Sequence, residues 1–155
     1  MATEIERKFL LANGNWRTKV VTSIKIIQGY LSRDETTVRI RKSGNQAWLT
    51  IKGPSQGISR LEYEYAIPPA DADQMLMTLC DDQLIEKTRH LVPVDALTWE
   101  IDEFHGRHHG LIVAELELPH EHTAFERPDW LGQEVSSDPR YRNSYLASNP
   151  FSGNP

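Results

Sequence analysis

The sequence lacks several features that would assign it to particular classes of protein. Its 155 residues include a single cysteine, Cys80, which excludes an internal disulfide and fits the apolar filling of a helix. There is no apolar run of membrane-spanning length, no secretory pattern and no lipidation motif, so we expect a cytoplasmic protein without a membrane partner. A net charge of -5 argues against a nucleic acid polymer as partner but leaves room for a small anion in a local basic pocket.

The composition is that of a globular protein, and the residue patterns predict mainly short strands. With 39% hydrophobic residues, the chain is expected to form a single domain over 1–155. Alternating patterns between turn residues predict strands near 3–11, 23–32, 36–43, 46–53, 60–68, 83–92, 96–104 and 110–118. Helical spacing and capping residues predict short helices near 16–20, 70–81 and 139–147. The sequence therefore predicts a mainly β (α+β) protein, either a sandwich or a barrel.

Charged residues two positions apart recur along most of these strands. The first strand carries Glu4, Glu6 and Lys8 on one face, while Ile5 and Phe9 lie on the other. The later strands repeat this spacing in blocks of one sign, with the following members: Arg39 and Arg41, Glu62 and Glu64, Lys87 and Arg89, Glu100 and Asp102, and Glu115 and Glu117.

Two interpretations of these doublets are open. One is an amphipathic sheet whose wet face is covered by cross-strand ion pairs. The other is a closed sheet that turns all the ionic faces into one lumen. Crowded carboxylates would repel each other there unless divalent cations lay among them, and oxygen ligands suit Mg²⁺ or Mn²⁺. Arginine and lysine on the facing strands would bind phosphate oxygens, so this interpretation predicts a small polyphosphate as ligand.

The ordered set of motifs resembles the CYTH, or triphosphate tunnel metalloenzyme, superfamily. The similarity begins with EIERKF, which matches an ExExK signature, and continues through QGYL, RIR, TIK, EYE, EKTR, EID and ELE to the terminal DPRYRNSYLA. The resemblance implies a closed eight-stranded antiparallel β-barrel tunnel with a few short helices outside. It also implies metal-dependent hydrolysis of a triphosphate by metal-activated water, with inorganic tripolyphosphate as the expected substrate.

The resemblance also implies roles for individual residues. The expected phosphate-binding residues are Lys8, Tyr30, Arg39, Arg41, Lys52, Lys87 and Arg89. The expected metal-binding residues, for two Mg²⁺ or Mn²⁺ ions, are Glu4, Glu6, Glu62, Glu64, Asp102, Glu115 and Glu117. Within these sets, Glu4, Glu6, Lys87 and Arg89 are expected to be catalytic. Arg140, Arg142 and Asn143 follow near the expected tunnel mouth, where they either touch substrate or are solvated.

Other functions remain open on the same sequence. An adenylate cyclase would need a nucleoside pocket, and a thiamine triphosphatase would need an aromatic cradle, for which Trp16, Trp48 and Tyr30 are candidates. A non-catalytic polyphosphate or nucleotide binder is a further alternative, although the acidic doublets speak against it. The histidines at 105, 108, 109, 120 and 122 fit an exposed turn better than a metal site. A homodimer is compatible with an apolar outer barrel face.

Overall fold

The computed structural model describes residues 3–80 and 84–151, and most of them lie in antiparallel strands. The strands are β1 (Thr3–Leu11), β2 (Thr22–Arg33), β3 (Thr37–Ser43), β4 (Gln46–Lys52), β5 (Ser59–Ala66), β6 (Ile85–Val94), β7 (Leu97–Phe104), β8 (Ile112–Glu117) and β9 (Leu131–Glu134). The α-helices are α1 (Pro69–Thr78) and α2 (Asn143–Leu146), and short 3-10 turns are η1 (Asn15–Lys19), η2 (Gly106–His108) and η3 (Pro139–Tyr141).

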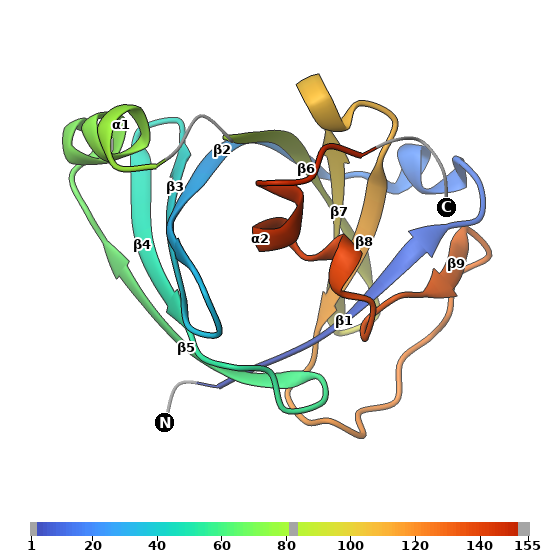
Figure 1. Cartoon of the computed structure of the whole chain (residues 1–155). Helices are drawn as coiled ribbons and strands as arrows, with labels where there is room; N and C mark the ends of the chain where they lie inside the picture. Colours follow the sequence, from blue (N-terminus) through green and yellow to red (C-terminus); the bar gives the residue numbers. More distant parts are fainter. Residues whose placement is uncertain (1–2, 81–83, 152–155) are drawn as a thin grey trace.

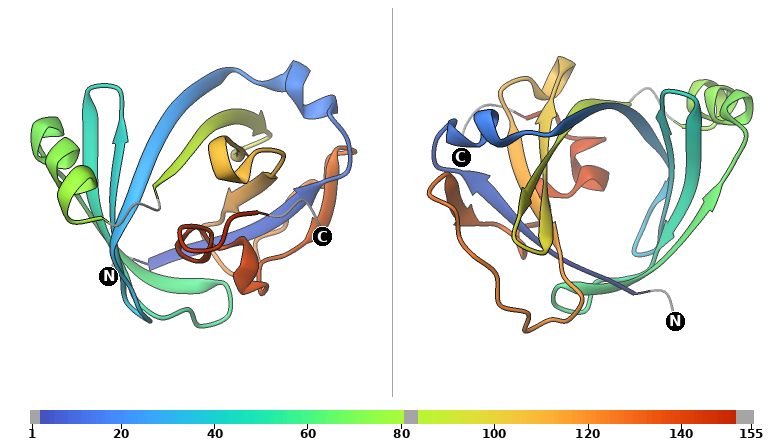
Figure 2. Two further views of the ribbon diagram at one scale, coloured as in Figure 1. Left: turned by 45° about the horizontal axis from the view of Figure 1, so that its top comes forward. Right: turned by 180° about the vertical axis from the view of Figure 1, so that it is seen from behind.

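Eight of these strands close into a barrel, as the sequence predicts. They follow the order β5-β4-β3-β2-β6-β7-β8-β1, and an additional pairing of β5 with β1 completes the ring seen in Figures 1 and 2. The N-terminal part of β1 closes the ring. Its residues Thr3 to Ile5 pair antiparallel with Leu61 to Ser59 of β5. The later part of β1 pairs on the same side with β9, through Phe9 and Leu11.

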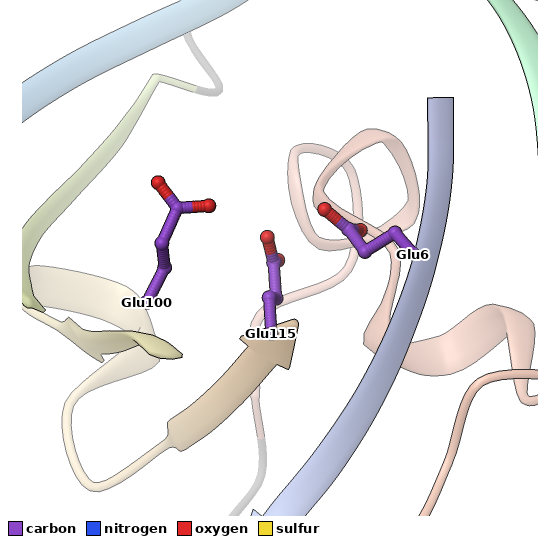
Figure 3. A group of neighbouring side chains, drawn as sticks. All are labelled: Glu6, Glu100 and Glu115. Carbon is purple, nitrogen blue, oxygen red and sulfur yellow. The ribbon is translucent and has the colours of Figure 1, made fainter. Parts of the chain in front are cut away.

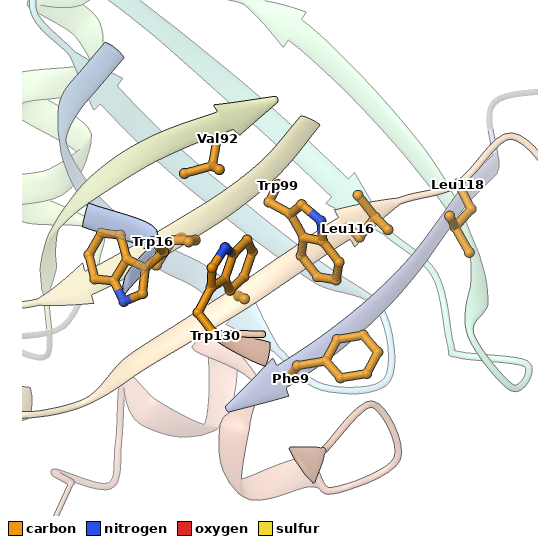
Figure 4. Packing of buried hydrophobic residues seen from close by; sticks show 9 residues of the cluster. Phe9, Trp16, Val92, Trp99, Leu116, Leu118 and Trp130 are labelled. Atoms are coloured by element: carbon orange, nitrogen blue, oxygen red, sulfur yellow. The ribbon is translucent and has the colours of Figure 1, made fainter. Parts of the chain in front are cut away.

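Strand alternation sends the apolar residues to the outside of the barrel. Phe9, Trp99 and Leu116 point away from the ionic faces of β1, β7 and β8, and they form one buried cluster with Trp16 and Trp130 (Figure 4). The rings of Trp99 and Trp130 meet edge to face at 5.4 Å, and those of Phe9 and Trp99 at 5.6 Å. The main hydrophobic core therefore lies between the barrel wall and the segments that cover it.

A second apolar cluster lies where α1 covers β3 and β4. Leu76 of the helix packs with Ile40 and Ala47 of the strands and with Cys80, which is buried. This placement confirms Cys80 as core filling. Gly29 of β2 is required beside it, because a Cβ there would lie 2.9 Å from the cysteine Sγ.

The structure differs from the predicted elements near the C-terminus. The single helix expected over 139–147 is wrong, because Arg142 adopts an extended conformation (φ -74°, ψ 138°) and separates η3 from α2. The short strand β9 is an additional element that the sequence pattern does not predict. The expected helix near 70–81 ends at Thr78. Residue 81, the end of that predicted helix, and residue 83, the start of the strand predicted over 83–92, lie outside the described residues. Within the described ranges, no helix has the length and apolar character needed to cross a membrane.

Candidate active site

The ionic faces of the strands enclose one cavity, which we call the central cavity, with a volume of about 260 Å³. Its acidic lining residues are Glu4, Glu6, Glu62, Glu64, Glu100, Glu115 and Glu117. Its basic lining residues are Lys8, Arg39, Arg41, Lys52, Arg60, Arg89 and Arg142. The shared lumen is thus the correct interpretation of the charged doublets, and a wet outer face is the wrong one.

The two signs of charge lie on different parts of the barrel wall. Strands β8, β1 and β5 are neighbours and carry most of the carboxylates, whereas β3 and β6 flank β2 on the other side and carry arginines and Lys87. Lys8 and Lys52 lie among or beside the acidic strands, and each reaches a carboxylate. Lys52 Nζ donates to both oxygens of Glu4, at 2.9 and 3.1 Å, and Lys8 Nζ lies 3.6 Å from Glu115.

Three carboxylates gather on the acidic side of the cavity. Ligand oxygens of Glu6, Glu100 and Glu115, from β1, β7 and β8, all lie within 4.8 Å of one another (Figure 3). No other cluster of this kind occurs among the described residues. The register explains it, because Glu100 is the direct cross-strand partner of Glu115 and β1 is the next strand.

Neighbouring carboxylates in this cluster have opposite electrostatic surroundings. Burial, together with the negative charges of Glu115 and Glu4, raises the pKa of Glu6 well above its usual range. Burial opposes ionisation of Glu115 as well, but Lys8 and Arg89 hold the pKa of that carboxyl well below its usual range. An ionised Glu6 therefore needs an additional positive charge, which a hard cation among these oxygen ligands would supply.

The remaining expected carboxylates lie around this cluster. Burial opposes ionisation of Glu4, but the ammonium of Lys52 lowers its pKa overall. Glu62 lies 3.4 Å from the same ammonium. Glu64 accepts a hydrogen bond from Thr50 at 2.9 Å, and Glu117 is the exposed cross-strand partner of Glu6.

Asp102, expected among the metal-binding residues, is fully buried and is not part of the cavity lining. Its two oxygens accept hydrogen bonds from Arg89 Nε at 2.8 Å and Nη2 at 2.9 Å. Lys87 Nζ lies 2.7 Å from the same carboxylate. These cations lower the pKa of Asp102, although burial alone would raise it. The structure therefore places this aspartate behind the cavity wall, bound to two of the expected phosphate-binding residues.

The expected phosphate-binding residues other than Lys87 line the cavity. Arg41 Nε donates to Gln28 Oε1 at 2.8 Å, and burial together with Arg39 and Arg89 lowers the pKa of its guanidinium to about 9. The buried Nε of Arg39 has no hydrogen-bond partner within the described residues. Tyr30 is buried and lines the cavity. Lys87 does not line it, and burial lowers the pKa of its ammonium to about 7.

Of the three C-terminal residues expected near the tunnel mouth, two line the cavity and one does not. Asn143 and Arg142 line the central cavity, and Asn143 Oδ1 accepts a hydrogen bond from Lys87 at 2.9 Å. Arg140 lies outside, where it pairs with Asp138 at 2.8 Å. His108 is buried and its Nε2 lies 2.6 Å from the carbonyl oxygen of Leu146, so it serves packing and backbone hydrogen bonding.

A closed antiparallel barrel with an acidic and a basic side to its cavity has the charge distribution that suits a polyanion together with cations. The chain belongs to the CYTH domain family, whose model matches residues 2–144. It is 45% identical over 152 residues to an inorganic triphosphatase of Acetivibrio thermocellus, covering 97% of each chain. It is also 36% identical to an inorganic triphosphatase of Nitrosomonas europaea, over 94% of this chain and 97% of that one. A crystal structure of an inorganic triphosphatase matches with a TM-score of 0.65 and 33% identity, covering 95% of both chains.

Proposed function

We propose that this protein is an inorganic triphosphatase, which hydrolyses inorganic tripolyphosphate in the central cavity and releases phosphate. The observation that carries the proposal is the cavity itself, in which arginines and lysines face a cluster of carboxylates. Two relatives that match nearly the full chain have the same activity in their names. Charged groups fixed in a partly enclosed site stabilise the charge of a phosphoryl-transfer transition state without reorganisation.

The basic side of the cavity is proposed to hold the phosphates. Arg39 and Arg41 are next to each other on one face of β3, so their guanidinium groups can engage successive phosphates. Lys8, Lys52 and Arg89 extend the set toward the acidic side. Tyr30 adds a phenolic hydroxyl on β2, and Lys87 contributes positive charge from behind the wall.

The acidic side is proposed to hold Mg²⁺ or Mn²⁺, with two ions expected from the family. Glu6, Glu100 and Glu115 fit one such ion best, because their oxygens are close together and because burial and the neighbouring carboxylates of Glu6 outweigh the effect of Lys52 and Lys8 on its pKa. Glu4, Glu62, Glu64 and Glu117 line the same cavity and complete the proposed ligand set. When bound, the metal would supply Lewis acidity toward phosphate oxygens and the attacking water.

We assign Asp102 a positioning role. Both of its oxygens are bound by Arg89, Lys87 is also in contact, and Asp102 does not line the central cavity. A carboxylate in this place fixes the direction of the Arg89 fork, as bidentate pairs do. The metal ligand on β7 is then Glu100, two residues earlier on the same face.

The lining of the cavity favours inorganic triphosphate over an organic one. Tyr30 is the one aromatic residue that lines it among the described residues. Trp16, a candidate for a thiamine cradle, lies instead in the hydrophobic cluster outside the barrel. A nucleoside or thiamine group would thus find little stacking surface, which disfavours the cyclase and thiamine triphosphatase alternatives.

A phosphate-release assay tests the proposal. Tripolyphosphate, ATP and thiamine triphosphate are each incubated with the protein and Mg²⁺ or Mn²⁺, with Glu6→Gln as the inactive control. Metal-dependent release from tripolyphosphate, exceeding that from the other two, is the expected result. Cyclic AMP formed from ATP would support the cyclase instead, and binding without turnover would support the non-catalytic binder. The expected homodimer stays a prediction, which light scattering measures.

A further inference from the structure

Two side-chain amides connect a pair of cations on the basic side of the cavity. Arg41 Nε donates to Gln28 Oε1 at 2.8 Å, and Gln28 Nε2 donates to Asn143 Oδ1 at 3.0 Å. The same oxygen of Asn143 accepts from Lys87 Nζ at 2.9 Å. Gln28 is fully buried on β2 as the cross-strand partner of Arg41, whereas Asn143 begins α2. This bridge attaches the C-terminal segment, seen over the barrel opening in Figure 1, to the barrel wall.

The chemistry of Arg41 fixes the orientation of both amides. Its guanidinium is a donor without an acceptor, so the atom of Gln28 that faces it must be the amide oxygen. The nitrogen of Gln28 must then face the oxygen of Asn143. The oxygen of Asn143 is thereby occupied by two donors, and its NH₂ group has no hydrogen-bond partner within residues 3–80 and 84–151.

The free amide group belongs to a residue that lines the central cavity, whereas Lys87 does not line it. The Lys87 side chain has 0% exposure, and its ammonium is held between Asp102 and Asn143. Neutral carbonyl oxygens bind Arg41 and Lys87 without cancelling their charge, as an additional carboxylate would do. The positive potential is preserved, and of the two residues Lys87 and Asn143 it is Asn143 that lines the cavity and can touch an anion there.

We propose that Asn143 is a substrate-contacting residue whose amide NH₂ donates a hydrogen bond to a phosphate oxygen of bound polyphosphate. The inference rests on the proposed function, because it takes tripolyphosphate as the ligand. It makes the C-terminal segment part of the phosphate site. The donor is uncharged, and its direction is set by the two hydrogen bonds that its oxygen accepts.

The test compares two substitutions that separate contact from scaffolding. Asn143→Asp keeps an oxygen for Lys87 and Gln28 but replaces the donor by a second oxygen, whereas Asn143→Ala removes both functions. Binding of tripolyphosphate is measured by titration calorimetry in EDTA, where turnover does not interfere. We expect affinity to fall about 10-fold for Asn143→Ala and about 100-fold for Asn143→Asp, since hydrogen bonds to charged groups have this magnitude.

The opposite order would overturn the inference. If Asn143 only positions Lys87, Asn143→Asp would bind as well as Asn143→Ala or better, because it retains the acceptor. If α2 only shields Lys87 from the ligand, Asn143→Ala would expose the ammonium and would bind tripolyphosphate more tightly than the wild type.

Ser144, the next residue, also lines the cavity, so Ser144→Asp controls for added negative charge. An equal loss in Ser144→Asp would mean that charge rather than contact explains the effect and would overturn the inference. Thermal unfolding verifies that each variant is folded.

The two proposals fail in distinguishable ways. If the wild type binds tripolyphosphate and the expected order holds, yet no phosphate is released with Mg²⁺ or Mn²⁺, the proposed hydrolysis is wrong and the contact stands. If phosphate is released but the order is reversed, the contact is wrong and the hydrolysis stands. If the wild type does not bind tripolyphosphate in EDTA but releases phosphate from it with Mg²⁺ or Mn²⁺, the contact as a metal-independent one is wrong and the hydrolysis stands. A wild-type chain that neither binds tripolyphosphate nor releases phosphate from it would overturn both.

Discussion

Arg89 and Asp102 are joined by two parallel hydrogen bonds, Nε to Oδ1 at 2.8 Å and Nη2 to Oδ2 at 2.9 Å, between cross-strand partners on β6 and β7. The aspartate is fully buried and the arginine nearly so. A bidentate pair in such surroundings fixes the guanidinium plane. The remaining Nη1 donates to Glu100 at 3.2 Å, so one arginine links the buried aspartate to the carboxylate cluster of the cavity.

The first prediction concerns this pair. Asp102→Ala leaves the buried cations Lys87 and Arg89 without their carboxylate and should destabilise the fold by about 3–5 kcal/mol in urea unfolding. Asp102→Asn, which keeps the shape and one acceptor, should lose less stability. If Asp102 were a metal ligand instead, the alanine variant would lose metal binding while its metal-free stability stayed near that of the wild type.

The second prediction contrasts Glu6 with Glu115 in the metal-free protein at neutral pH. Glu6→Gln should raise stability, because the ionised carboxylate of Glu6 is buried beside other negative charges. Glu115→Gln should lower stability by about 1–3 kcal/mol, since it weakens the contacts with Lys8 and Arg89. Denaturant unfolding of both variants in EDTA measures the difference, and equal signs would contradict the electrostatic assignment.

The same contrast has a defined pH dependence. The folded-state pKa of Glu6 is raised above the usual 4.5, so its contribution to stability is lost as pH rises from about that value through the folded pKa. The gain from Glu6→Gln should therefore grow with increasing pH. The folded-state pKa of Glu115 is lowered, so its contribution is present above 4.5 and is lost as pH falls through the folded pKa. The loss from Glu115→Gln should therefore shrink in acid.

The third prediction addresses the metal. Adding Mg²⁺ or Mn²⁺ to metal-free protein should raise the melting temperature, because a ligand that binds only the native state stabilises it. Glu100→Gln should abolish most of this rise, since Glu100 belongs to the carboxylate cluster. Asp102→Asn is the matched control on the same strand face and should retain it. A full shift in Glu100→Gln would remove this residue from the proposed ligands.

The fourth prediction separates an arginine of the cavity from one outside it. Arg41→Ala should lower kcat/KM for tripolyphosphate by about 10- to 100-fold, because a charge-assisted contact to phosphate is lost. Arg140→Ala should leave the kinetics unchanged, since Arg140 is exposed and pairs with Asp138. Steady-state kinetics of the two variants measure this, and equal effects would mean that Arg41 acts only through the overall charge.

The barrel and most of the candidate site could be predicted from sequence because strand periodicity is regular. Glu4, Glu6 and Lys8 must share a face whenever their segment is a strand, and the same holds for Arg39 and Arg41. Strand spacing places Glu100 and Asp102 on one face, and the family resemblance assigns only Asp102 to the metal. The two side chains have different partners because of the register of β7 against its two neighbouring strands. This register pairs Asp102 with Arg89 of β6 and Glu100 with Glu115 of β8. Spacing within one strand contains no information about such pairings.

The C-terminal region was harder to predict for another physical reason. Local signals at Asp138 and Pro139 favour a helix, and Asp138 does cap the turn by accepting from the amide of Arg140. The break at Arg142 follows from tertiary contacts, since Asn143 meets Gln28 and Lys87 across the barrel opening. Strand β9 likewise forms only because the later part of β1 offers it an edge.

The pairing of β1 has a consequence for how the molecule could be inactivated. Among the described residues, the pairing of this strand with β5 consists of Thr3 to Ile5, so the closure of the barrel depends on the first part of a nine-residue strand. The same strand supplies Glu4, Glu6 and Lys8 to the interior. Proteolytic removal of the residues through Ile5 would open the barrel between β1 and β5 and would remove the Glu4 carboxylate in the same event, so the closed wall and part of the acidic side would be lost together.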